Sequence, residues 1–461
     1  MHHDVVIIGA GMSGLAAGIR LAHFDRRVLI VEKHYAFGGL NSYYTLGKRA
    51  FDVGLHAVTN FADPKDRSAP LNKLLRQLRL RWEDFDLKPQ RFTEVRFPGR
   101  RLRWTNDASS LLDSVAETFP KEADGFRRLV AFLRDYDDTR LDASERSARA
   151  ALTEFLRDPS LIDMLLCPLM YYGSTTEHDM DVSHFATLFK SIFLEGFARP
   201  VEGVRRIIKT LVRRYRACGG KIRMRCGVRR IIVNDGRVQA LELDDGDTIT
   251  ADVVLSSAGY HETMRLCSDR SWNPAPEEMG RISFVESILV LDRRPDELGH
   301  EATIVFFNDA DRFTYAVPDD LIDARSGVVC CPTNYIGHET IPEGWFRVTL
   351  LADPLRWKTL DGAAYRHAKE RVLEEAIRRG EAYMPALRKH VVFSDTFTPR
   401  TIERYTGHLH GAVYGAPRKR RDGRTDIANL FLCGTDQGFL GIIGAMLSGI
   451  TIANLHVLSE G

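Results

Sequence analysis

A strand, a glycine-rich turn, a helix and a second strand follow one another within the first 32 residues. Residues 4–14 read DVVIIGAGMSG, and residues 28–32 read VLIVE. The run at residues 5–8 is apolar without interruption, which is typical of a strand buried on both faces of a parallel sheet. This order of elements predicts an α/β unit with a parallel sheet at the start of the chain.

The turn contains three glycines in the spacing G-x-G-x-x-G. Gly9 permits a tight turn, Gly11 lets a pyrophosphate approach the backbone, and Gly14 lets the helix and the strand pack closely. Free N–H groups at the helix start near Met12 would hold the phosphates. Glu32 ends the second strand, where a carboxylate accepts hydrogen bonds from a ribose 2′-hydroxyl. The sequence therefore predicts a Rossmann-like dinucleotide site.

Length and composition set limits on the class of protein. A chain of 461 residues exceeds what one core usually supports, so we expect two domains. The formal net charge of +2 predicts no general attraction for nucleic acid. The seven cysteines show no C-x-x-C spacing, so we expect neither a disulfide framework nor a metal site. This cysteine usage and a first strand that begins at once predict a cytoplasmic protein without a signal peptide.

Three further blocks identify the dinucleotide. Residues 38–42 read GGLNS, residues 429–436 read NLFLCGTD, and residues 441–449 read GIIGAMLSG. Together with the first unit, they resemble the FAD-binding superfamily that includes amine oxidases, phytoene desaturases, carotenoid isomerases and retinol saturases. The resemblance implies FAD rather than NAD as the cofactor. Residues 439–458 lack Asp, Glu, Lys and Arg, and we expect them to be a buried helix that contacts the flavin rather than a membrane span.

The resemblance also assigns roles to individual residues. It places the double glycine under the pyrophosphate and the flavin, and the late carboxylate, Asp436, at the ribityl-phosphate region. The helix start after Asp436 would offer backbone N–H groups to the flavin pyrimidine edge, and Val228 would touch the adenine through its backbone. The expected FAD-binding residues are Gly9, Gly11, Met12, Ser13, Gly14, Glu32, Lys33, Gly38, Gly39, Leu40, Asn41, Val228, Gly434, Asp436, Gly444, Ala445 and Met446.

The middle of the chain predicts two interleaved domains. Residues 201–216 have apolar positions at helical spacing, and strands and turns follow to residue 259. This stretch resembles the return of the family's chain into its FAD-binding domain. The predicted fold is α/β, with a Rossmann-like FAD-binding domain (residues 1–85, 196–262 and 405–461) interleaved with an α+β substrate domain (residues 86–195 and 263–404).

The substrate class comes from residues 399–415, whose glycine and tyrosine turns resemble the desaturase, isomerase and saturase branch. This branch implies a long apolar isoprenoid or polyene substrate, such as a carotenoid, and desaturation by hydride transfer to flavin N5. No second G-x-G-x-x-G occurs, so we expect electrons to pass to oxygen or a quinone. Open alternatives are a reduced-flavin isomerase or saturase, an amine oxidase, and a flavin-free lipid carrier similar to the Rab GDP-dissociation inhibitors.

Polar catalytic candidates are few. His56 follows a segment, residues 51–54, that the resemblance places beside the isoalloxazine, and it is either an acid, base or flavin partner or a hydrogen-bonded core histidine. His410 is the second candidate, with a structural role as the alternative. The basic run at residues 418–421 is either a solvated loop or a contact with anionic lipid, which would place the protein on the inner membrane surface.

Overall fold

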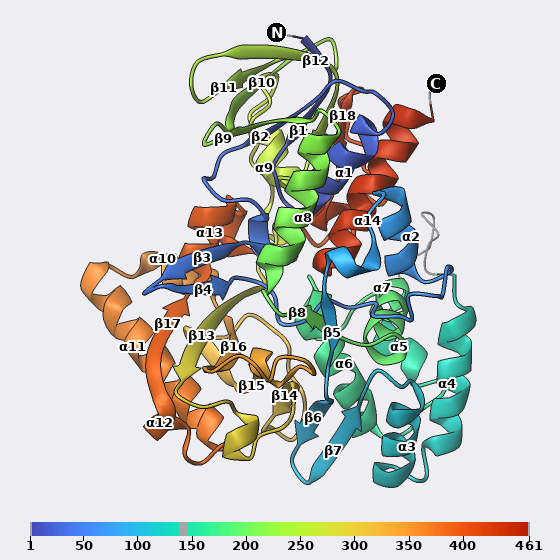
Figure 1. The fold of residues 1–461 in the computed structure, drawn as a ribbon, viewed down its shortest axis with the longest axis vertical. Helices are drawn as coiled ribbons and strands as arrows, with labels where there is room; N and C mark the ends of the chain where they lie inside the picture. Colours follow the sequence, from blue (N-terminus) through green and yellow to red (C-terminus); the bar gives the residue numbers. More distant parts are fainter. Residues whose placement is uncertain (1, 138–145, 460–461) are drawn as a thin grey trace.

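Two seven-stranded sheets form the framework of the computed structural model, which describes residues 2–137 and 146–459 (Figure 1). The first sheet has the order β10-β11-β12-β1-β2-β9, and β18 pairs with β12 outside this path. Its strands are β1 (His2–Ile8), β2 (Val28–Glu32), β9 (Lys221–Met224), β10 (Val228–Asn234), β11 (Arg237–Leu243), β12 (Thr248–Ser256) and β18 (Leu430–Leu432).

The parallel part of this sheet is the predicted unit. β1 pairs in parallel with β2 and β12, with Val5 opposite Val28 and Val253. Helix α1 (Met12–Ala22) packs against α14 (Gly441–Ala453), and a Cβ added at Gly449 would lie 2.0 Å from the carbonyl oxygen of Ser13. The first and last parts of the chain therefore lie side by side behind the sheet.

The second sheet has the order β17-β13-β16-β15-β14-β6-β7 and is antiparallel except between β14 and β6. Helix α11 (Gly362–Glu381) packs on one face, and an apolar core that includes α6 lies on the other. The strands are β6 (Thr93–Phe97), β7 (Arg100–Trp104), β13 (Ser283–Leu291), β14 (Ile304–Asn308), β15 (Ile322–Cys330), β16 (Gly344–Ala352) and β17 (Val391–Phe397).

The remaining elements connect or cover these sheets. Two small sheets pair β3 (Tyr43–Leu46) with β4 (Arg49–Asp52) and β5 (Leu87–Pro89) with β8 (Ala198–Pro200). The other helices are α2 (Pro70–Gln77), α3 (Ser109–Thr118), α4 (Ala123–Asp135), α5 (Ala148–Leu152), α6 (Pro159–Gly173), α7 (Val182–Phe189), α8 (Val204–Ala217), α9 (Tyr260–Met264), α10 (Pro354–Thr359), α12 (Leu387–His390) and α13 (Pro399–Thr406).

The chain alternates between the two sheets, as the colours of Figure 1 show. It leaves the first sheet after β2, forms β6 and β7, and returns for β9 to β12. It then builds β13 to β17 and comes back with β18 and α14. The predicted α/β class, with parallel and antiparallel sheets, is confirmed, whereas the exact domain boundaries stay a prediction.

Within residues 2–137 and 146–459, one helix is long and apolar enough to cross a membrane. The window Gly441–Leu458 has a mean hydropathy of 1.6, and 56% of it is buried inside the protein. Its packing against α1 accounts for an apolar composition without a bilayer.

The segment at residues 399–415, for which the sequence predicts glycine and tyrosine turns, begins with a helix. This helix, α13, has a proline at its start and ends at Gly407, whose φ is 80°.

Candidate functional site

A cleft of about 500 Å³ opens at the carboxyl ends of β1, β2 and β12. In parallel sheets this edge is where ligands bind, because the loops that leave the strands diverge there. The cleft runs from the glycine turn past β3 to β17 and α13. Its lining includes seven predicted cofactor residues: Gly9, Gly11, Glu32, Lys33, Gly39, Leu40 and Val228.

The glycine turn has the backbone that its motif predicts. Gly9 has φ of 99°, which only glycine adopts without strain. A Cβ at Gly14 would lie 2.1 Å from the carbonyl oxygen of Gly9, so the helix touches the strand there. A Cβ at Gly11 would meet no atom within 4 Å, because this residue faces the open cleft. The turn therefore leaves room for a bulky polar group beside the backbone.

The Glu32 carboxylate is held firmly at the cleft wall. Its two oxygens accept hydrogen bonds from the backbone N–H groups of Ala10 and His34, each at 2.7 Å. The buried Nε2 of His34, which also lines the cleft, has no hydrogen-bond partner. A fixed carboxylate and an unpaired imidazole nitrogen suit a ligand that carries hydroxyl groups. These residues fit the ribose of a dinucleotide.

The late acidic residue lies behind this cleft, outside its lining. Asp436 is 2% exposed and accepts hydrogen bonds from the backbone N–H groups of Tyr260 at 2.6 Å and Ala416 at 2.8 Å. Its neighbour Gly434 approaches the start of α1, where a Cβ would lie 2.8 Å from Ser13 Oγ. The other expected residues of this region, Gly444, Ala445 and Met446, lie in the first two turns of α14.

Five residues of the two glycine segments also lie outside the lining: Met12, Ser13, Gly14, Gly38 and Asn41. Met12 and Ser13 have buried side chains, so only their backbone N–H groups at the start of α1 can serve a ligand. Gly38 donates its backbone N–H to Ala10 at 3.0 Å, and Asn41 belongs to the single turn that follows. The structure thus brings the two glycine segments together, whereas their contact with the pyrophosphate and the flavin stays a prediction.

A histidine–carboxylate pair lines the same cleft. His408 Nδ1 lies 3.6 Å from Glu262 Oε1, which also accepts the backbone N–H of Leu409 at 2.8 Å. Burial alone would lower the pKa of His408, but the Glu262 carboxylate raises it above its ordinary value. Burial would raise the pKa of Glu262, and the hydrogen bond from His408 lowers it. The pair places an imidazole and a carboxylate side by side on the cleft wall.

His56, the first catalytic candidate, belongs to a buried polar network. Its Nε2 lies 3.2 Å from Glu286 Oε2 and 3.1 Å from Thr349 Oγ1. Burial lowers the pKa of His56 despite the opposing effect of the carboxylate. Burial would raise the pKa of Glu286, but the guanidinium of Arg347 lowers it. His56 is therefore neutral, and Glu286 is ionised.

Two buried arginines fix the segment that carries His56. Arg347 pairs with Glu286 and donates to the carbonyl oxygens of Val53 and Leu55. Arg199 pairs with Asp52 and donates to the same Leu55 oxygen. Val53 also lines the cleft, so the network holds one of its walls. Sequence analysis missed both arginines, because the partners lie far apart along the chain.

His410, the second candidate, lies elsewhere. It is half-buried, has φ of 60°, and is outside the cleft lining in the part of the chain that the structure describes. Its buried Nδ1 lacks a hydrogen-bond partner. Among the described residues, no hydrogen bond or ion pair joins His410 to His56. The histidine that reaches the cleft from this segment is His408.

Comparison with known proteins agrees with a flavin site. The model of a family described as flavin containing amine oxidoreductase matches residues 12–313. This stretch begins with α1, directly after the first two glycines of the turn, and includes both small sheets and the return into the first large sheet.

Three curated relatives cover nearly the whole chain. An all-trans-retinol 13,14-reductase from Danio rerio is 22% identical over 98% of this chain and 87% of its own length. A chloroplastic prolycopene isomerase from an Oncidium hybrid cultivar is 23% identical over 98% and 83%. A lycopene-forming phytoene desaturase from Pseudescherichia vulneris is 25% identical over 98% of both chains.

A solved structure shows the same fold. An oxidoreductase from Methanosarcina mazei superposes with a TM-score of 0.67 at 18% identity, covering 98% of this chain and 99% of its own.

Proposed function

This chain belongs to the family of flavin-containing amine oxidoreductases, and we propose that it uses FAD to desaturate a long apolar isoprenoid such as a carotenoid. It is a flavin-dependent oxidoreductase, and its relatives among retinol reductases, prolycopene isomerases and phytoene desaturases support the carotenoid branch. The choice of FAD rests on the cleft at the carboxyl edge of the first sheet, where Glu32 faces a glycine turn that leaves room for a pyrophosphate.

The residues of the chain have separable tasks in this proposal. Glu32 accepts a ribose hydroxyl, and the N–H groups at the start of α1 hold the phosphates. The His408–Glu262 pair supplies polar groups on the cleft wall. The Arg199 and Arg347 pairs keep residues 52–56 rigid, so that the wall does not rearrange around an apolar substrate. When bound, FAD supplies the hydride acceptor at flavin N5.

Neutral His56 offers a place for a proton beside the cleft. Desaturation removes a hydride from one carbon and a proton from its neighbour, and a neutral imidazole accepts a proton where an imidazolium cannot. The ionised Glu286 at 3.2 Å would stabilise the positive charge that His56 then carries. His56 is therefore our candidate for the base.

The visible spectrum of the purified, flavin-loaded protein tests the proposal. Under anaerobic conditions, a polyene precursor supplied in liposomes should bleach the flavin band near about 450 nm, because the substrate gives up a hydride. Denaturation followed by chromatography of the released cofactor should yield FAD rather than FMN. A purified protein that binds no flavin would contradict the proposal and favour the lipid carrier.

An unbleached band would favour a different direction of the same chemistry. The printed activities of two relatives, a retinol reductase and a prolycopene isomerase, support saturation or isomerisation as the second candidate. Chemically reduced flavin would then be reoxidised by a polyene in the first case. In the second, the polyene would isomerise with no net change in the flavin band.

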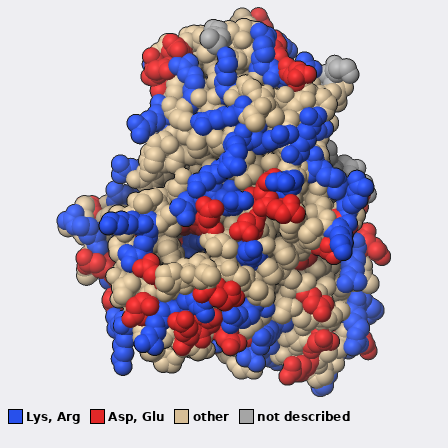
Figure 2. Space-filling view, in the orientation of Figure 1, with Lys and Arg blue, Asp and Glu red and all other residues tan. Residues whose placement is uncertain are grey.

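We also propose a cytoplasmic protein that contacts the inner membrane surface and passes electrons to oxygen or a quinone. The run at 418–421 supports this contact poorly: Lys419 is buried, Arg420 stacks on Tyr260 at 3.8 Å, and Arg421 pairs with Asp181. The outer face of α8 is a better candidate, because its basic side chains form a band across the view in Figure 2.

A further inference from the structure

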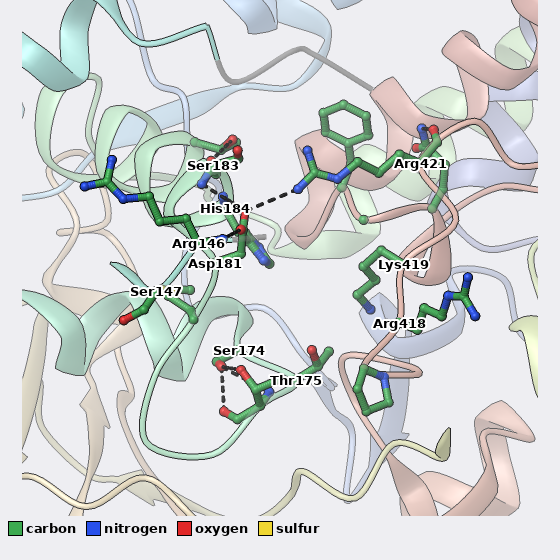
Figure 3. Close-up of a pocket in the computed structure, with 17 residues that line it drawn as sticks. Arg146, Ser147, Ser174, Thr175, Asp181, Ser183, His184, Arg418, Lys419 and Arg421 are labelled. Atoms are coloured by element: carbon green, nitrogen blue, oxygen red, sulfur yellow. Dashed lines mark hydrogen bonds and ion pairs between the residues drawn. The ribbon is translucent and has the colours of Figure 1, made fainter. Parts of the chain in front are cut away.

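A second cavity, of about 630 Å³, lies between α7 and the loop at residues 417–421 (Figure 3). One wall is formed by residues 437–439, which lead directly into α14. Among the described residues, its lining has no member in common with the dinucleotide cleft. The cavity therefore approaches the predicted flavin-contacting helix from a separate side.

The lining is strongly positive. Among the described residues it contains one carboxylate, that of Asp181, which already accepts the backbone N–H of Ser183 at 2.9 Å and pairs with Arg421 at 3.2 Å. An anion that enters the cavity would thus meet attraction from several sides and little repulsion. The basic residues of the lining are Arg146, Arg418, Lys419 and Arg421.

Lys419 is the cation that points into the cavity, as Figure 3 shows. Its side chain is 13% exposed, and its Nζ donates to the carbonyl oxygen of Tyr414 at 2.6 Å. The nearest carboxylate oxygen, Asp436 Oδ1, is 3.8 Å away and already accepts a backbone N–H group. Burial lowers the pKa of Lys419 to about 8. A buried ammonium with such incomplete pairing favours an additional anionic partner.

Gln437 provides an independent sign that the cavity takes a polar occupant. It is 1% exposed and lines the cavity, and its Oε1 has no hydrogen-bond partner. Water or a polar ligand with its hydration can satisfy this oxygen, whereas a hydrocarbon cannot. Filling the cavity with an apolar group would leave Gln437 Oε1 without a hydrogen bond and would remove solvent from the incompletely paired ammonium of Lys419.

We propose that this cavity binds the carboxylate end of an amphipathic polyene acid, with Lys419 as the principal ligand. The inference rests on the proposed function, because it names the polar end of the polyene on which the enzyme acts. The substrate would then be an oxygenated isoprenoid acid rather than a pure hydrocarbon. The ammonium of Lys419 donates to the carboxylate, and Ser174 and Thr175 line the cavity from a separate loop, as Figure 3 shows.

A binding experiment on the flavin-loaded protein tests this assignment. Retinoic acid and retinol serve as a matched acid and alcohol, and quenching of protein fluorescence reports their affinities. At pH 7 the acid should bind about tenfold more tightly than the alcohol. Lys419→Met should weaken binding of the acid by about tenfold to a hundredfold and leave the alcohol within about twofold. Lys419→Arg should retain the preference, and Lys73→Met, which removes an exposed lysine on α2, should change neither affinity.

The pH dependence supplies a second readout that needs no variant. Affinity for the acid should be constant between about pH 6 and 7, where the carboxylate of the ligand and Lys419 are both charged, and should fall as pH rises through 8 and Lys419 loses its proton. Burial lowers the pKa of His184 to about 4, so this neighbour stays neutral over that range. The other charged groups that face Lys419 are Asp181, Arg146, Arg418, Arg421 and Asp436.

Several results would overturn the assignment. They are equal affinities for acid and alcohol in the unmodified protein, equal losses for both ligands in Lys419→Met, and displacement of the acid by the same concentration of inorganic phosphate. If Lys419→Met fails to fold, the pH series and the Lys419→Arg variant test the assignment in its place. Acid binding without any flavin reduction by polyenes would refute the proposed function alone. Flavin bleaching by a hydrocarbon, without acid preference, would refute this inference alone.

Discussion

At the scale of single residues, Gly11 and Gly14 separate stability from cofactor binding. Gly14→Ala should lower the free energy of unfolding by about 1–3 kcal/mol, because its Cβ would lie 2.1 Å from a backbone oxygen. Gly11→Ala should cost less than about 1 kcal/mol, because its φ of −72° suits alanine and its Cβ meets no atom. Denaturant unfolding of the flavin-free protein measures both.

The flavin content of the purified Gly11→Ala variant tests the role of Gly11 in cofactor binding. Gly11→Ala should lose bound flavin although it folds, because its methyl group enters the cleft where we expect the pyrophosphate. Unchanged flavin content in Gly11→Ala would show that the cofactor does not approach this residue.

The His408–Glu262 pair predicts a pH-dependent contribution to stability. The pKa of His408 is raised, so this stabilisation is complete below about pH 6.5 and is lost as pH rises through the folded value. The pKa of Glu262 is lowered, so its share is present above about pH 4.5 and is lost as pH falls through its folded value. Glu262→Gln should therefore destabilise the protein most between these limits, by about 1–3 kcal/mol.

Unfolding of this variant at several pH values provides the measurement. Its deficit relative to the unmodified protein should shrink as pH rises above 6.5. Glu277→Gln, at an exposed position, is the matched control and should show no such profile. A deficit that stays constant with pH would mean that the pair is not charged in the folded protein.

At the scale of elements, the Glu286–Arg347 pair couples β13 and β16 to the segment that carries His56. Arg347→Met should lower the free energy of unfolding by about 3–5 kcal/mol, because it leaves a buried carboxylate without its cation. Combining it with Glu286→Gln should recover part of that loss. Arg325→Met breaks an ion pair on β15 in which the arginine side chain is 64% exposed, and should cost less than about 1 kcal/mol. Equal losses in the two arginine variants would exclude a special role for the buried pair.

The same elements show which features of the fold and the site could be predicted from the sequence alone. The first unit was predictable because strand, turn and helix lie within 30 residues and each follows a local rule. The His56 network was not, because Glu286 lies 230 residues further along the chain and no local pattern links the two. Likewise, the turn residues of 399–415 concealed α13, which is helical because Pro399 occupies its first position.

At the scale of the whole molecule, the distribution of basic side chains predicts salt-sensitive membrane binding. Vesicles with anionic lipid should bind the protein at low salt, at about 1 kcal/mol per basic residue near the surface, and release it at high salt. Arg213→Gln with Arg216→Gln removes two exposed charges from α8 and should weaken this binding. Arg127→Gln with Arg128→Gln, on α4, is the control. Vesicle flotation that is indifferent to salt and to the α8 charges would contradict this prediction.

The side-by-side placement of α1 and α14 has a consequence for how the protein is made. β12 pairs with β1 on one side and with β18 on the other, so the predicted cofactor region combines segments that are far apart along the chain. β18 and α14 can join it only after residues beyond 429 have left the ribosome. A growing chain therefore leaves this face of the first sheet uncovered until then, and we expect stable flavin binding only after α14 has been made.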